Sequence, residues 1–118
     1  MKLRWVTLHV SDMDKSVAFY RDLLGLKIDR QFGNEEHMIT FFGEGDDAKV
    51  ELIYQRGAAI ENAGKGVSMG FGVQNLDSVI EELKKHVTAP ITGPISPNPG
   101  IRFYLVPDPD GYTIQLYE

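Results

Sequence analysis

The sequence contains no cysteine, and this absence excludes several kinds of chemistry at once. Disulfide bonds, a thiolate nucleophile and cysteine-ligated zinc or iron–sulfur centres all require that residue. The sequence also lacks any run that approaches the roughly 20 apolar residues of a membrane-spanning helix. Charged residues interrupt the first apolar positions, where a secretory signal peptide would have an uncharged segment. We therefore expect a cytoplasmic protein.

Basic residues are few relative to acidic ones. The 118-residue chain has 12 lysines and arginines against 17 aspartates and glutamates, so its formal net charge is −5. This balance gives no net attraction for nucleic acid or for an anionic membrane surface, and it leaves cationic or neutral small molecules as compatible partners. With 42% hydrophobic residues, the chain is long enough to bury a core as one domain.

The first half predicts a β-α-β-β-β order of elements. Apolar and polar residues alternate from Leu3 to Val10, which is the pattern of a half-buried strand. Trp5, Thr7 and His9 share one face of this strand, and we expect that face to line a cleft. An aspartate cap and apolar residues at helical spacing then predict a helix that ends at Gly25. Three further strands, separated by turn-forming residues, are predicted at Leu26–Gln31, His37–Phe42 and Lys49–Tyr54.

The second half repeats this order. Residues 73–77 fall on residues 10–14 when the halves are laid over one another, and such a repeat indicates duplication of one small unit. After a linker over residues 60–66, the predicted elements are a strand at Val67–Val73 and a helix at Ser78–His86. A proline-rich stretch over residues 89–100 is interpreted as an irregular loop that begins near a short strand at Ile91. Strands at Ile101–Val106 and Tyr112–Tyr117 complete the second half.

Three segments carry a resemblance to a known family: His9–Met13, Ser16–Leu26 and Asp108–Leu116. Together with the two halves, they resemble the vicinal oxygen chelate superfamily, which includes glyoxalase I, bleomycin-resistance proteins and extradiol dioxygenases. The resemblance implies an α+β fold in which two β-α-β-β-β modules form curled mixed sheets around a cleft. It implies one glyoxalase-like domain over residues 1–118, with module one at about 1–57 and module two at about 66–118. It also implies a homodimer, because modules of two subunits combine in the small members.

Metal-using members of this family place four ligands on their sheets, and the resemblance puts these positions at Trp5, Glu51, Ser68 and Gln115. Only Glu51 is a residue type that commonly holds a divalent ion, since tryptophan only donates hydrogen bonds and glutamine carries no charge. We therefore expect no metal and no other cofactor, and these departures argue against glyoxalase I chemistry. A rearranged metal site built from His9, His37 and Glu51 remains an alternative.

Glu51 is the strongest single candidate for function. A carboxylate between apolar strand neighbours is costly to bury without a partner, and a salt bridge to Arg102 is the structural alternative. His9 would hold a substrate carboxylate or act as a base, or it would only line a pocket. Arg102 and Tyr104 alternate with apolar residues, and we expect this polar pair to face the cleft. The full predicted ligand-binding set is Trp5, Thr7, His9, Glu51, Ser68, Arg102, Tyr104 and Gln115.

Three functions are compatible with these residues. The leading hypothesis is a metal-independent protein of the glyoxalase and bleomycin-resistance type that binds a small organic molecule. The alternative is a lyase or isomerase of the glyoxalase type, with Glu51 as the catalytic base and His9 as an orienting group. The third is an interaction domain without a ligand, in which Trp5 and phenylalanine side chains fill the cleft.

Overall fold

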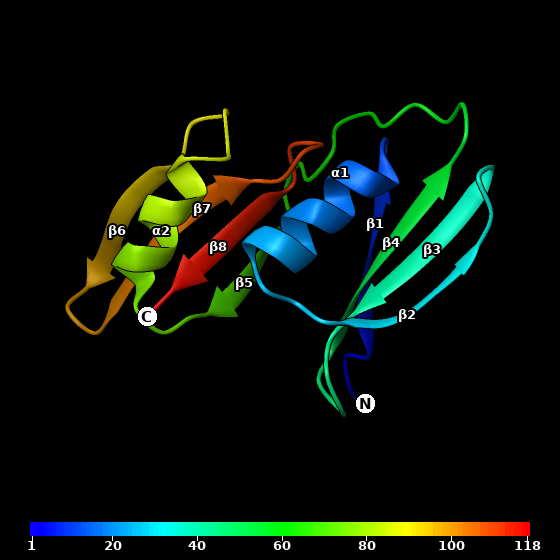
Figure 1. Ribbon diagram of the computed structural model, residues 1–118. Helices are drawn as coiled ribbons and strands as arrows, with labels where there is room; N and C mark the ends of the chain where they lie inside the picture. Colours follow the sequence, from blue (N-terminus) through cyan, green and yellow to red (C-terminus); the bar gives the residue numbers. More distant parts are fainter. The chain divides into compact units, whose positions relative to one another are not determined.

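The computed structural model describes residues 1–118, and the chain divides into two compact units, Met1–Ala63 (unit 1) and Gly64–Glu118 (unit 2). Each unit contains one helical segment and a curled four-stranded sheet of mixed direction (Figure 1). The α+β fold and its two β-α-β-β-β halves are therefore as predicted. None of the helices is long and apolar enough to span a membrane.

Unit 1 consists of β1 (Trp5–Val10), α1 (Met13–Val17), a π-helical continuation η1 (Ala18–Leu23), β2 (Ile28–Gly33), β3 (His37–Phe42) and β4 (Lys49–Gln55). The strands lie in the order β1-β4-β3-β2, and only the β1–β4 pair is parallel. Asp12 caps α1, because its carboxylate accepts a hydrogen bond from the Lys15 backbone N–H at 3.0 Å. Gly25, with φ of +77°, follows the end of η1, as glycine commonly does after a helix.

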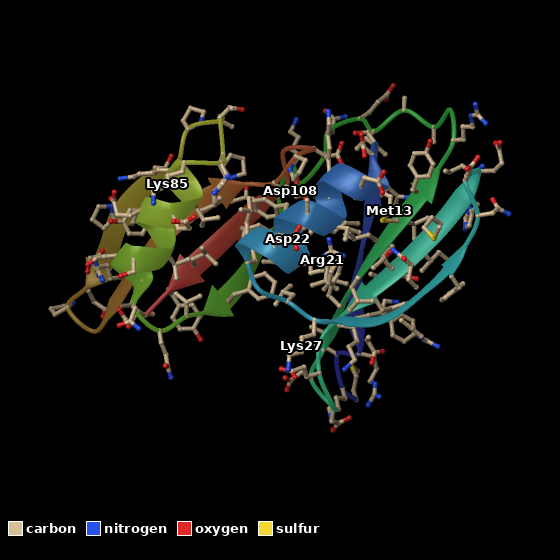
Figure 2. The ribbon with its side chains drawn as sticks, viewed as in Figure 1. Met13, Arg21, Asp22, Lys27, Lys85 and Asp108 are labelled. Atoms are coloured by element: carbon tan, nitrogen blue, oxygen red, sulfur yellow. The ribbon has the colours of Figure 1, made fainter.

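The core of unit 1 lies between the helical segment and one face of its sheet. Met13 lies at the N-terminal end of α1 (Figure 2). Its sulfur accepts a hydrogen bond from the buried Thr40 hydroxyl at 3.4 Å. Thr40 pairs with the fully buried Leu52, so the face that carries both residues is the covered one. Buried Leu8 alternates with exposed Thr7 along β1, and this pattern confirms the predicted half-buried strand.

Unit 2 consists of β5 (Ser68–Gly72), α2 (Leu76–Lys84), β6 (Thr92–Asn98), β7 (Ile101–Pro107) and β8 (Thr113–Tyr117), with strand order β5-β8-β7-β6. Helix α2 begins two residues earlier than predicted. The Glu118 carboxylate explains this start, because it accepts hydrogen bonds from the backbone N–H groups of Asn75 at 2.9 Å and Leu76 at 3.4 Å. This cap from the end of the chain supplies acceptors that the adjacent sequence does not.

The structure corrects the prediction of an irregular loop over residues 89–100. Most of this stretch forms β6, an edge strand that pairs with β7 at Thr92–Leu105, Ile95–Phe103 and Asn98–Ile101. The register shifts between these pairs. Proline is tolerated at an edge strand and at bulges, because the missing N–H need not join a ladder of hydrogen bonds. The prolines therefore interrupt the pairing of β6 without removing the strand.

The packing of unit 1 makes a stability prediction for Leu52→Ala. Leu52 is fully buried in β4, so its truncation should lower the free energy of unfolding by about 2–5 kcal/mol. Ile53→Ala removes an aliphatic group from the other face of the same strand and should cost less. Urea denaturation followed by the fluorescence of Trp5, the single tryptophan, measures both. Equal losses in the two variants would contradict the assignment of the covered face.

Candidate functional site

Glu51 lies on the sheet face of unit 1 that the helix leaves open, and two neighbouring strands place side chains beside it. Parallel pairing sets Thr7 of β1 opposite Glu51, and the Thr7 hydroxyl donates a hydrogen bond to Glu51 Oε1 at 2.5 Å. Antiparallel pairing sets Phe41 of β3 on the other side. The carboxylate therefore sits between a hydroxyl donor and an aromatic ring.

Aromatic side chains extend this open face. The Trp5 and Phe41 rings meet edge to face, with centroids 6.4 Å apart and planes 87° apart. Phe41 is only 7% exposed, whereas Trp5 is 55% exposed. His9 pairs with Ile53 and shares the exposed side of β1 with Trp5 and Thr7. The structure thus brings together four predicted residues, which are Trp5, Thr7, His9 and Glu51.

Arg102 forms its ion pairs with residues of unit 2. The sequence had offered a salt bridge to Glu51 as an alternative, and Arg102 does not form one with it. Its guanidinium donates to Asp77 at 2.7 Å and lies 3.7 Å from the Glu118 carboxylate. The hydrogen bond to Asp77 raises the pKa of Arg102 above its usual value. Glu51 instead has the neutral Thr7 as its hydrogen-bond partner.

The predicted orientation of Arg102 and Tyr104 is wrong. Tyr104 pairs with Leu116, is buried, and lies on the core side of β7. Gln115 is on the other face of the sheet, where it pairs with Leu105 and with Gly70. Because side chains alternate along a strand, Phe103 and Leu105 share the face of Gln115, and Arg102 and Tyr104 do not. Ser68 is two residues from Gly70 in β5 and so shares that face as predicted.

The residues at the four family positions do not fit a divalent metal. Trp5, Ser68 and Gln115 provide no anionic or imidazole ligand, which leaves Glu51 as the single carboxylate. The alternative with His9, His37 and Glu51 is also wrong, since no group of three or more histidine, aspartate or glutamate side chains is arranged to hold a metal ion. His37 Nδ1 instead lies 2.6 Å from Gln55 Oε1.

A cavity of about 410 Å³ in unit 1 lies away from Glu51. It is formed by the start of α1 around Asp12 and Met13, by Asn34 in the β2–β3 turn, and by Met38 and Tyr54. Met38 and Tyr54 pair with each other on the sheet face that carries Thr40, so this cavity is on the helix-covered side. None of the predicted site residues contributes to its walls.

Phe41 and Arg30 also belong to the open face, and neither was predicted from the sequence to line the site. The Arg30 guanidinium carbon lies 4.7 Å from the centroid of the Phe41 ring. The alternation of side chains along the predicted strand His37–Phe42 could have placed Phe41 on the face opposite to Thr40. Arg30 gave no such signal, because an irregularity in the pairing of β2 decides which way it points.

Comparisons with known proteins agree with this fold. The model of the Glyoxalase/Bleomycin resistance protein/Dioxygenase superfamily matches residues 2–116. The lactoylglutathione lyase of Salmonella typhimurium is 32% identical over 127 residues, covering 100% of this chain and 93% of that protein. A probable lactoylglutathione lyase of Vibrio cholerae is 30% identical over 119 residues, covering 94% and 86%.

Solved structures share the architecture. The trypanothione-dependent glyoxalase I of Leishmania major is 27% identical with a TM-score of 0.76, covering 98% of this chain and 85% of that one. An antibiotic-binding protein from Streptomyces has the same fold at 18% identity and a TM-score of 0.72, covering 98% and 93%. On the family match and the two lyases, this chain belongs to the Glyoxalase/Bleomycin resistance protein/Dioxygenase superfamily.

Proposed function

We propose that this protein binds a small organic molecule on the open face of unit 1, with Glu51 as the central contact and without a metal ion. The observation that carries the proposal is the environment of Glu51. Its carboxylate has a neutral hydroxyl as its partner and aromatic groups close by, so its charge is available to a ligand. A ligand ammonium, N–H or O–H group would satisfy it, since hydrogen bonds to a charged acceptor are the stronger kind.

Neighbouring side chains would hold the body of such a ligand. The exposed Trp5 ring offers a flat apolar surface for stacking, and His9 adds a polar group on the same side of β1. Thr7 fixes the Glu51 carboxylate, which reduces the freedom lost on binding. Separately, Ser68 and Gln115 remain proposed polar ligand contacts on the sheet of unit 2 taken by itself.

Metal independence is part of the proposal and rests on residue chemistry. Three of the four positions that hold the metal in the family carry tryptophan, serine or glutamine in this chain. These side chains would neither balance the charge of a divalent ion nor deprotonate to bind it.

A second candidate function is catalysis, and the names of the relatives favour it. Proteins about 30% identical to this chain are lactoylglutathione lyases. In a lyase or isomerase, Glu51 would take a proton from the substrate and His9 would orient it. Full activity in a Glu51→Gln variant would remove Glu51 from that mechanism.

We also propose a homodimer, which the family resemblance suggests, and a cytoplasmic location. Large apolar residues outside the ligand site, such as Leu3 and Ile101, are exposed, and exposed apolar patches mark interfaces. Light scattering coupled to size-exclusion chromatography should give twice the chain mass of 13.2 kDa. A monomer mass that persists as the protein concentration rises would refute the dimer.

Metal analysis separates this proposal from glyoxalase I chemistry. After incubation with nickel or zinc and removal of free ion, elemental analysis should find well below one ion per chain, because the four family metal positions carry only one anionic side chain. A parallel assay should find no turnover of a hemithioacetal. Stoichiometric uptake together with turnover would overturn the proposal.

Replacing Glu51 by glutamine tests the site itself. Glu51→Gln keeps the shape of the side chain and removes the charge, so the affinity for benzylamine should fall about tenfold, the lower range for a hydrogen bond to a charged group. Quenching of Trp5 fluorescence measures the affinity, since Trp5 is on the same face. Glu81→Gln, in the exposed Glu81–Lys84 pair of α2, is the matched control and should bind as the unmodified protein does. Equal affinities in all three proteins would exclude Glu51.

A further inference from the structure

Arg30 differs from the other arginines of this chain in lacking a carboxylate partner. The other four form ion pairs with aspartate or glutamate: Arg4, Arg21, Arg56 and Arg102. Arg30 instead lies over two aromatic rings, with its guanidinium carbon 4.7 Å from the centroid of Phe41 and 6.0 Å from that of Phe32. In a chain with 17 acidic residues, an arginine held only by rings keeps its hydrogen-bond donors available.

A β-bulge in β2 places this guanidinium on the open face. Ile28 pairs with Phe42, whereas Arg30 pairs with Phe41, so β2 has one residue more than β3 between these pairs. With regular pairing, Arg30 would lie opposite Thr40, which is fully buried on the helix-covered face. A charged group there would lose its hydration at high cost. Bulges recur next to functional sites because they redirect side chains in this way.

The same pairing aligns Arg30 with Glu51. Successive partners across the sheet are Arg30 on β2, Phe41 on β3, Glu51 on β4 and Thr7 on β1. Adjacent strands are about 4.8 Å apart, so the backbones of Arg30 and Glu51 are separated by about 10 Å. The Phe41 ring lies between them. The Arg30 guanidinium covers this ring, which is only 7% exposed. A cation and an anion therefore lie in one row of the open face, at a spacing comparable to the length of one substituted benzene ring.

We propose that Arg30 binds the carboxylate of the small organic ligand, which makes the ligand class an aromatic acid. The planar guanidinium fork matches a carboxylate through two parallel hydrogen bonds, and stacking on Phe41 orients that fork. The aromatic body of the ligand would lie against the exposed Trp5 ring, and a donor group at its other end would reach Glu51. This inference rests on the proposed function and specifies its ligand.

The charge of the chain makes this assignment specific. A protein with a formal charge of −5 repels anions in general, so recognition of an acid needs a dedicated cation. Lys49 also lies on the open face, but its ammonium donates a hydrogen bond to the Gly45 carbonyl at 2.7 Å. Arg30 is the cation of this face that is held only by aromatic rings. A molecule with an acidic and a basic end would use both Arg30 and Glu51, and it would bind more tightly than a molecule with either end alone.

Three matched probes test the assignment by calorimetry and Trp5 fluorescence: para-(aminomethyl)benzoate, para-toluate and benzylamine. The first has both charged groups, the second only the carboxylate, and the third only the ammonium. Arg30→Gln should weaken the two carboxylates about tenfold and leave benzylamine unchanged. Arg30→Lys keeps the charge without the planar fork, and its losses should be smaller. Arg56→Gln, which breaks the exposed pair with Glu36, is the control and should change none of the affinities.

The outcomes separate this inference from the proposed function. If Arg30→Gln binds both carboxylates as tightly as the unmodified protein while Glu51→Gln still weakens benzylamine, Arg30 has no such role and the proposed site stands. If Arg30→Gln weakens the carboxylates but Glu51→Gln changes nothing, the Arg30 assignment is supported and the role of Glu51 fails. If the unmodified protein binds none of the probes, both are overturned. Circular dichroism of each variant checks that a lost affinity does not reflect lost folding.

Discussion

Each sheet of this protein has one face packed against the core and a second face that the helix of the same unit does not cover. The side chains of a strand alternate between these faces, so each side chain of β1 and β4 points either to the core or to the open face. Leu8 and Leu52 are buried in unit 1, while Thr7 and Glu51 meet on the open face. The candidate site follows from this division, because burying one set of residues exposes the other.

Local patterns were sufficient to predict the elements of unit 1. The alternation around Leu8 and the aspartate before α1 are short-range signals, and the structure agrees with both. Long-range contacts were invisible to this reasoning. Helix α2 starts early because the Glu118 carboxylate caps it at Leu76. These two residues are 42 positions apart in the sequence. Strand β6 forms despite its prolines because β7 is beside it.

The candidate site was predictable to a similar extent. Trp5, Thr7 and His9 follow from alternation along one strand, and the family positions identified Glu51. Tyr104 was assigned to the wrong face because polarity alone was used to choose between two alternating sets, and its ring is buried against the core. Arg30 was missed because a bulge reverses the direction of its side chain, and a single sequence gives no sign of that extra residue.

The central claim is that the Glu51 face binds an organic ligand without a metal ion. The most direct measurement is the affinity for para-(aminomethyl)benzoate, followed by Trp5 fluorescence, in chelator-treated protein and again with nickel added. We predict the same dissociation constant in both conditions, because the charged ends of this ligand would meet side chains of the protein. Binding that occurs only after nickel is added would contradict the claim.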